Sequence, residues 1–295
     1  MATAKMDEPA SKVVVADNST GRAGTPVPSQ AGWNAARKSV TTSTGQRLSY
    51  VEMGAPDGVP ILLLHGYTDN SRAWSPLAHY LAGRRLIALD LRGHGGSAVP
   101  ACSYGIDTLA HDVDGFMEAL DIDRADVVGH SLGSMTAAAL AGFYPGRVDR
   151  LVLLSTAISF PKEAIDWLWD NVPNLNHPLD PNSEFMLAWF SNPTPVDEDF
   201  LTRDRSESAA VAAPVWMGVL RAFTMLDWRL LAARITAPTL VMWADQDALF
   251  GAASQSRVKE VLPSAKYETF AGLGHNFIWE QPAEAAAVIN GFLAR

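Results

Sequence analysis

The sequence has a single cysteine, Cys102, so the chain cannot form an internal disulfide bond. No group of cysteine and histidine residues has the spacing of zinc ligands, and no motif surrounds Cys102. The sequence therefore implies neither a metal ion nor an organic cofactor, and we expect none.

Long hydrophobic segments are also missing. No apolar run approaches the length needed to cross a bilayer, so we expect no membrane partner. The N-terminus lacks a charged region followed by an apolar stretch, as a secretory signal peptide would have. A cytoplasmic protein is the default expectation, and a mature exported form would share these features.

Basic residues are outnumbered by acidic ones, 23 to 32, which gives a formal net charge of −9. Nucleic acid is therefore not an expected partner, because phosphate binding needs a basic surface. Hydrophobic residues make up 48% of the chain and charged residues 19%, the balance of a globular protein with a sizeable core. We expect a small molecule as the substrate, and the sequence does not indicate an oligomeric state.

The pattern of apolar residues changes along the chain. Residues 1–36 are rich in Ala, Ser, Thr, Gly and Pro without any period, which predicts a flexible tail. Further on, short apolar runs predict strands within residues 47–54, 60–66, 85–97, 125–131, 149–156, 237–247 and 265–275. Helical patterns lie between these runs, at 72–82, 107–120, 132–144, 254–262 and 282–293. Strands that alternate with helices predict an α/β fold with a parallel sheet between helices.

Residues 157–235 interrupt this alternation, because they contain no buried strand but three apolar helical patches. An insertion of this length late in the sheet predicts a helical cap, which leaves residues 37–156 and 236–295 as the core. Five of the nine tryptophans lie in the insertion, and we expect most to pack within it and one or two to face a pocket. The candidates for contact with a substrate are Trp167, Trp189 and Trp216.

The stretch VVGHSLGSMT places Ser131 between two glycines, after an apolar strand and before a helix. A serine hydroxyl needs a base to become a nucleophile, and a sharp strand-to-helix turn presents it to a substrate. Such a turn brings the residues two before and two after the serine together, and here these are Gly129 and Gly133. The pattern favours a catalytic serine over the alternative, a glycine-rich turn with an incidental serine.

The expected base is a histidine on a later loop, and GLGHNF places His275 just after the last strand. We expect His130 to point away from the serine, because side chains alternate along a strand. The acid that orients the histidine lies in WADQDALF, which offers Asp245 and Asp247. Asp247 lies further into the loop and reaches the histidine more easily, and the family resemblance described below implies the same choice, which leaves Asp245 to order the loop.

Acyl transfer also needs N–H donors for the developing oxyanion. The Leu132 N–H follows the serine directly, and the second donor is expected in HGYTDN, where the Tyr67 N–H is the candidate. The Tyr67 side chain and Asp69 are weaker candidates for facing the pocket. The alternative for HGYTDN is a plain turn stabilised by its polar side chains.

Five motifs together resemble the α/β-hydrolase superfamily, in its order and with its spacing, over residues 45–295. They are LLLHGYTDNSRAW, LIALDLRGHGGS, VVGHSLGSMTA, PTLVMWADQDALF and GLGHNFIWEQP. The resemblance implies an eight-stranded, mostly parallel sheet flanked by helices, with a helical cap inserted after the sixth strand. It implies a nucleophile, a base, an acid and two oxyanion donors at Ser131, His275, Asp247, Tyr67 and Leu132.

The serine argues against haloalkane dehalogenases and the family's epoxide hydrolases, which use an aspartate at this position. The pattern is most similar to the branch of esterases, enol-lactonases and cofactor-free haloperoxidases. We expect a hydrolase that cleaves a carboxylic ester or lactone of a moderately sized apolar or aromatic substrate through an acyl-enzyme. The alternatives are hydrolysis of a C–C bond, perhydrolysis with peroxide, and a receptor-like protein that binds a ligand with low turnover.

Overall fold

The computed structural model of the chain describes residues 24–294 and contains one eight-stranded sheet. Its strands are β1 (Lys38–Thr41), β2 (Arg47–Gly54), β3 (Ile61–Leu64), β4 (Arg85–Asp90), β5 (Ala125–His130), β6 (Val148–Leu154), β7 (Thr239–Ala244) and β8 (Lys266–Phe270). They lie in the order β1-β2-β4-β3-β5-β6-β7-β8. β2 pairs antiparallel with β1 and β4, and all other pairs are parallel. The predicted fold class is therefore confirmed.

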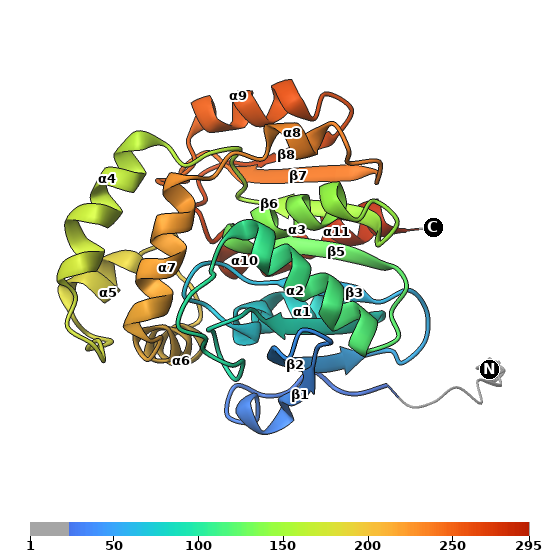
Figure 1. Cartoon of the computed structure of the whole chain (residues 1–295), viewed down its shortest axis with the longest axis horizontal. Helices are drawn as coiled ribbons and strands as arrows, with labels where there is room; N and C mark the ends of the chain where they lie inside the picture. The colour runs from blue at the N-terminus through green and yellow to red at the C-terminus, as the bar shows by residue number, and fades with distance from the viewer. Residues whose placement is uncertain (1–23, 295) are drawn as a thin grey trace, which may run out of the picture.

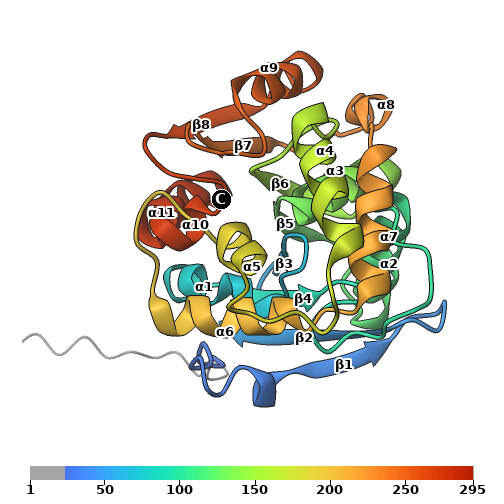
Figure 2. The ribbon, with the colours of Figure 1, turned by 90° about the vertical axis from the view of Figure 1, so that its left-hand side faces the viewer.

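Helices cover both faces of this sheet, which is why the central strands are apolar at almost every position. α2 (Ile106–Ala119) and α3 (Leu132–Phe143) lie on one face, and α1 (Ser75–Leu81), α10 (Phe277–Glu280) and α11 (Pro282–Leu293) on the other (Figure 2). α9 (Ala252–Val261) covers the edge formed by β7 and β8 (Figure 1). Within residues 24–294 no helix is long and apolar enough to cross a bilayer.

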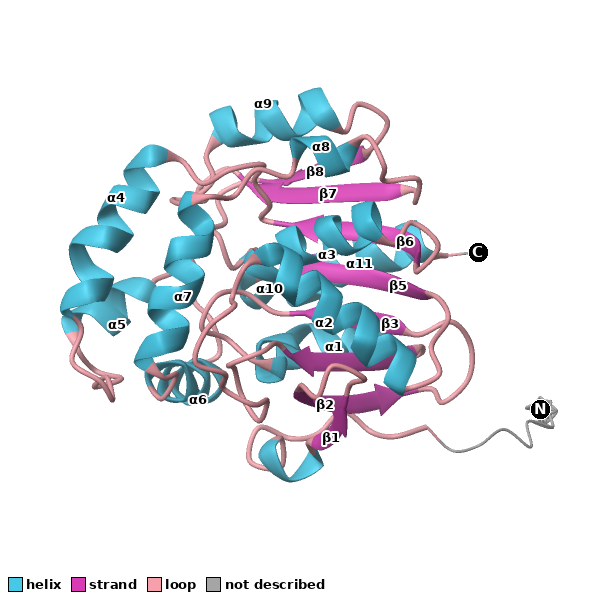
Figure 3. Cartoon of the chain, in the orientation of Figure 1, coloured by secondary structure: helices cyan, strands magenta, loops and turns pink. Residues whose placement is uncertain are grey.

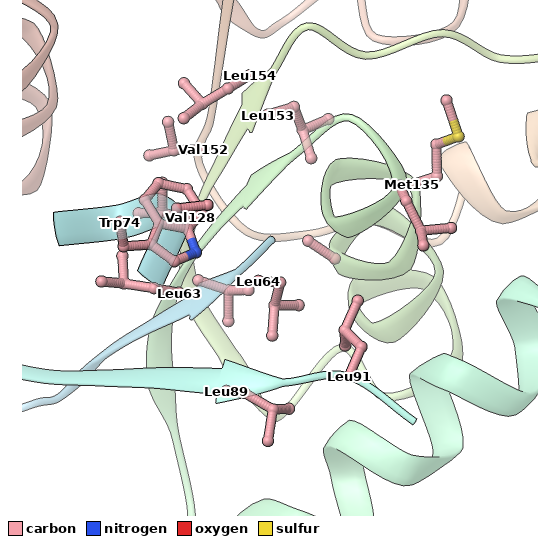
Figure 4. Packing of buried hydrophobic residues seen from close by; sticks show 14 of the residues in the cluster. Leu63, Leu64, Trp74, Leu89, Leu91, Val128, Met135, Val152, Leu153 and Leu154 are labelled. Atoms are coloured by element: carbon pink, nitrogen blue, oxygen red, sulfur yellow. The ribbon is translucent and has the colours of Figure 1, made fainter. Parts of the chain in front are cut away.

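The core packs in layers that follow the strand register. Leu63, Val128 and Val152 lie side by side on β3, β5 and β6. Figure 4 shows them on the same side of the sheet as Trp74, whereas Met135 of α3 lies on the opposite side. All five side chains are fully buried, so both faces of the sheet contribute to the core that holds the strand ends in place.

Between β6 and β7 the chain forms helices joined by loops and no strand, and we call residues 157–235 the inserted segment. Its α-helices are α4 (Lys162–Asn171), α5 (Glu184–Trp189), α6 (Glu198–Ala209), α7 (Ala213–Thr224) and α8 (Arg229–Ala232). Figures 1 and 3 show α4 to α7 gathered at one end of the sheet, whereas α8 returns to pack beside α3.

The described part of the predicted tail, residues 24–36, is tied to the core, because Thr25 pairs with Gly54 at the end of β2 and Trp33 is buried. Trp33 is fully buried, and its indole Nε1 donates a hydrogen bond of 3.1 Å to Ser71 Oγ. Burial of this large side chain fixes a segment whose other residues are mostly small and polar. Residues 1–23 lie outside the described residues.

Candidate active site

Ser131 joins β5 to α3 in a strained backbone conformation. Its φ is 51° and its ψ is −116°, a combination that residues with a side chain rarely adopt. A Cβ atom on Gly129 would lie 2.2 Å from the Gly133 carbonyl oxygen, and one on Gly133 would lie 2.0 Å from that of Leu64. The turn therefore requires glycine at both positions, as the sequence pattern indicates.

His275 follows β8 and contacts Asp247, which follows β7. Its Nδ1 lies 2.9 Å from Oδ2 and 3.0 Å from Oδ1 of that carboxylate. Oδ1 also accepts hydrogen bonds from the backbone N–H groups of Leu249 and Phe250, at 2.9 and 3.0 Å. Burial alone would raise the pKa of Asp247, but His275 and these backbone donors hold that pKa below its usual value. An ionised Asp247 can only accept, so the His275 proton sits on Nδ1 and leaves Nε2 free to act as a base.

The other carboxylate of this loop, Asp245, does not reach the histidine. Its Oδ1 accepts a hydrogen bond of 2.7 Å from the backbone N–H of Gly272, at the end of β8. Gly272 has a φ of 75°, so the chain turns sharply here before it returns toward His275. Asp245 thus orders the turn, and Asp247 supplies the contact with the imidazole.

His130 is placed differently from the expectation that it points away from the site. Its ring centroid lies 5.1 Å from that of His275, and its Nε2 lies 3.0 Å from the His275 carbonyl oxygen. The strand ends at Ser131, which has a positive φ. The rule that successive side chains of a strand point to opposite faces therefore does not apply to His130 and Ser131. Burial, and next the proximity of His275, lower the pKa of His130 to about 3, so this ring is neutral.

The two backbone amides predicted to face an oxyanion belong to Leu132, which follows Ser131 in the chain, and to Tyr67, which lines the same cavity as Ser131. Within residues 24–294 no hydrogen bond takes the N–H of Tyr67 or of Leu132, the first residue of α3. The Tyr67 side chain is buried, and its hydroxyl donates a hydrogen bond of 2.6 Å to the Trp216 carbonyl oxygen. Burial raises the pKa of Tyr67 well above its usual value, so this phenol stays protonated and tethers the inserted segment to the core.

A cavity of about 370 Å³ lies between the core and the inserted segment, a volume within the range of small-molecule sites. Its polar side chains include Asp69, His130, Ser131, His275 and Asn276. Its apolar side chains include Phe160, Trp167, Trp189, Phe223, Leu249 and Trp279. Within the described part of the chain, no three His, Cys, Asp or Glu side chains gather so that they could hold a metal ion.

The three tryptophans predicted to contact a substrate do not all reach this cavity. Trp167 and Trp189 line it, with nearly parallel rings whose centroids are 6.1 Å apart. Trp189 is fixed by a hydrogen bond of 3.0 Å from its Nε1 to Thr68 Oγ1. Trp216 is fully buried behind Tyr67, with 5.2 Å between the ring centroids, and is not among the lining residues. The sequence around Trp216 predicts an apolar helix, and this pattern is the same whether the side chain packs in the core or lines a pocket.

Asp69 is a cavity residue that the sequence indicated only weakly. It belongs to the loop after β3, lines the cavity and is 5% exposed. Burial raises the pKa of Asp69 to about 7, although His275 and the backbone of Gly66 pull it down. A carboxyl group that is partly protonated at neutral pH therefore lies in the same cavity as the serine and the histidine.

Comparisons with known proteins agree with this architecture. A family model described as alpha/beta hydrolase fold matches residues 59–282. A non-heme chloroperoxidase of Streptomyces lividans is 30% identical over 266 residues, which cover 82% of this chain and 94% of that protein. A 2-hydroxymuconate semialdehyde hydrolase of Pseudomonas sp. strain CF600 is 37% identical over 139 residues, covering 45% of this chain and 48% of that one. The crystal structure of a hydrolase from Pseudomonas aeruginosa PA01 superposes with a TM-score of 0.78 at 26% identity, covering 88% of this chain and 98% of that one.

Proposed function

The chain belongs to the alpha/beta hydrolase fold family, and from that premise we propose that it is a serine hydrolase of carboxylic esters or lactones. A fold does not fix a reaction, so the proposal rests on the site. The observation that carries it is the strained Ser131, which shares one cavity with a histidine whose Nδ1 is held by Asp247. This arrangement has the parts of a nucleophile, a base and an orienting acid.

In the proposed acylation step, Ser131 Oγ attacks the carbonyl carbon of the substrate while its proton passes to His275 Nε2. The Asp247 carboxylate stabilises the imidazolium that forms. The free N–H groups of Tyr67 and Leu132 stabilise the negative charge on the former carbonyl oxygen. The tetrahedral intermediate then collapses, and the leaving alcohol takes the proton from His275.

In the deacylation step, a water molecule attacks the acyl-enzyme and gives its proton to His275 Nε2. Collapse of the second intermediate releases the acid and returns the proton to Ser131. For a lactone, the leaving alcohol stays tethered to the acyl group, so the product is a single hydroxy acid.

The substrate that fits best is apolar or aromatic and of moderate size. The cavity has a volume of about 370 Å³, and aromatic rings from α4, α5 and α7 face the polar residues of the core across it. Apolar contact of this kind binds the body of a substrate, and the few polar groups orient it. The inserted segment would then select the substrate, and the core would carry out the chemistry.

Two other reactions are second candidates because of what the chain resembles. One similar protein is named a 2-hydroxymuconate semialdehyde hydrolase and another a non-heme chloroperoxidase. The proposed Ser131, His275 and Asp247 could also serve hydrolysis of a C–C bond or formation of a peracid from an acid and peroxide. Only the choice of substrate separates these reactions from ester hydrolysis.

The test is acid release at constant pH from a panel of simple esters, aliphatic lactones and aromatic lactones. We expect the wild-type protein to release acid and the Ser131→Ala variant to release none. Ser191→Ala is the matched control, because it removes another hydroxyl that lines the same cavity. Acid release that survives Ser131→Ala would overturn the mechanism, and silence of the folded wild type across the panel would favour one of the second candidates.

A further inference from the structure

The wall of the cavity beside Ser131 carries two polar groups that the proposed mechanism does not use, Asp69 and His130. A Cβ atom added to Gly66 would lie 2.7 Å from Asp69 Oδ2, 3.2 Å from His130 Nδ1 and 3.5 Å from the Cβ of Ser131. All three side chains thus surround one point of the backbone, and all line the cavity. We call Gly66, Asp69 and His130 the Asp69 corner.

His130 gives the Asp69 corner an unpaired acceptor. Its Nε2 faces the His275 carbonyl oxygen, which can only accept, so the proton of this neutral ring is on Nε2. Nδ1 is therefore a bare lone pair, and it is buried without a hydrogen-bond partner among the described residues. An unpaired buried acceptor is costly, and its lone pair adds negative potential beside the Asp69 carboxyl.

Helix α6 supplies a second carboxyl behind Asp69. Ser208 Oγ donates a hydrogen bond of 2.8 Å to Thr68 Oγ1, and Asn70 Nδ2 donates one of 2.8 Å to Glu207 Oε2, so α6 packs directly on the loop that carries Asp69. Asp204 lies one helical turn before Ser208, is fully buried, and has no hydrogen-bond partner within residues 24–294 on either carboxyl oxygen.

Burial, and after it the charge of Asp69, raise the pKa of Asp204 well above its usual value. This shift disfavours a second negative charge beside Asp69. A group that fits this corner must offer a hydrogen to acceptors, but it need not be a cation. His275 becomes positive during turnover in the proposed mechanism, which further disfavours an ammonium group close by.

We propose that Asp69 is a specificity-determining residue that binds a hydroxyl group of the substrate, a few bonds from the carbonyl carbon that Ser131 attacks. The hydroxyl donates to the Asp69 carboxyl, and it can accept in return when that carboxyl is protonated. The short reach follows from the packing of Asp69 and Ser131 around the same glycine. The inference rests on the proposed function and narrows its substrate class to esters or lactones of hydroxy acids with an aromatic or apolar body.

The kinetic test compares pairs of esters that differ by one hydroxyl: methyl mandelate with methyl phenylacetate, and methyl 3-hydroxy-3-phenylpropanoate with methyl 3-phenylpropanoate. The readout is the ratio of kcat/KM within each pair, measured for each enantiomer, in the wild type and in variants. Comparing ratios between proteins cancels the intrinsic reactivity of the esters. We expect a wild-type preference for one hydroxylated ester that falls about tenfold in Asp69→Leu and by less in Asp69→Asn, which keeps an acceptor oxygen.

Glu163→Gln is the matched control, because Glu163 is another carboxyl that lines the cavity but lies at its exposed side on α4. It should keep the wild-type ratio. A ratio that Asp69→Leu leaves unchanged on every pair would overturn the proposal. A stronger preference for the methyl ester of phenylglycine, lost in Asp69→Leu, would also overturn it in favour of a site for a cation.

A binding test separates failure of this proposal from failure of the proposed function. Mandelate and phenylacetate are titrated into the Ser131→Ala variant and into Ser131→Ala with Asp69→Leu, and heat or thermal stabilisation is recorded. Tighter binding of mandelate that depends on Asp69 supports the corner even if no ester is turned over. Equal binding of the two acids, together with equal turnover of the paired esters, would contradict the corner and leave the serine mechanism intact.

Discussion

The loop after β3 and the loop after β7 each carry one aspartate close to His275, and the two aspartates are equally buried, at 5% exposure. Asp69 lines the cavity, whereas Asp247 contacts the imidazole and is not among the lining residues. Asp247 accepts hydrogen bonds from His275 and from two backbone N–H groups, and its pKa is lowered. Burial raises the pKa of Asp69 to about 7, because His275 and the backbone of Gly66 offset only part of the cost of burying its charge.

The comparison shows that burial alone does not decide the state of a carboxyl group, because the donors around it do. The loop after β7 is built to keep a negative charge beside the histidine. The loop after β3 is built around a carboxyl that is easily protonated, and it lies against α6 of the inserted segment. We propose that the loop after β7 supports the chemistry and that the loop after β3 helps to select the substrate.

The largest effect on activity is expected when the carboxylates of Asp247 and Asp69 are replaced in turn. Asp247→Asn should lower kcat by about 10³–10⁴, because the histidine loses the partner that fixes its proton on Nδ1. Asp69→Asn should lower kcat by no more than about tenfold, the value of one hydrogen bond. The measurement is steady-state hydrolysis of the best ester of the panel, with Asp245→Asn as a control that stays near the wild type. Equal losses for Asp247→Asn and Asp69→Asn would contradict the division of roles.

The pH dependence of the free energy of unfolding provides a second test of the contrast between Asp69 and Asp247. The folded pKa of Asp69 is raised to about 7, so its contribution to stability is complete below its unfolded pKa near 4 and is lost as the pH rises through 7. Asp69→Asn should therefore stabilise the protein at about pH 8 by about 2–4 kcal/mol relative to its effect at about pH 5.

Asp247 should behave in the opposite way. Its folded pKa is lowered, so its contribution is present above its unfolded pKa and is lost only as the pH falls through the folded value. Asp247→Asn should therefore destabilise the protein at about pH 8, by about 1–3 kcal/mol. Urea unfolding of both variants at the two pH values measures these effects. Shifts of the same sign for both variants at the higher pH would refute the contrast.

The smallest expected effect comes from the side of the cavity that the inserted segment forms. Trp167→Ala should raise KM for aromatic esters about tenfold and change kcat by less than about twofold, because it removes apolar contact and no group that reacts. Leu187→Ala on the neighbouring helix α5 is the control, since Leu187 is exposed and does not line the cavity. A large fall in kcat with unchanged KM would place α4 in the chemistry instead.

Much of the fold could be predicted because its central strands are short apolar runs that end at glycine or polar residues. β1 was missed because Lys38–Thr41 is largely exposed and has no apolar run. α6 was missed because its residues are mostly polar, and its start at the cap of Asp197 is a weak signal. The packing of Trp33 also has no local signature, since a lone tryptophan in a polar segment does not say what it packs against.

In the candidate site, too, some residues could be predicted from the sequence and others could not. Ser131, Asp247 and His275 follow strands and fit a motif, and the structure brings the last two into contact. The loop that carries Asp69 packs against α6 of the inserted segment, whose Ser208 contacts Thr68 from 140 residues further along the chain. No local pattern could predict that juxtaposition. The predicted orientation of the His130 side chain was wrong, because the strained turn at Ser131 ends the regular alternation of side chains along the strand.

The most direct test of the central claim is the intact mass of the protein after exposure to an alkyl fluorophosphonate, which bonds covalently to an activated serine. We predict that the wild type gains the mass of one adduct, that peptide mapping places it on Ser131, and that Ser131→Ala gains none. Asp247→Asn should react more slowly, and Asp69→Asn nearly as fast as the wild type. An unlabelled wild type that still hydrolyses esters, or an adduct on another residue, would contradict the account.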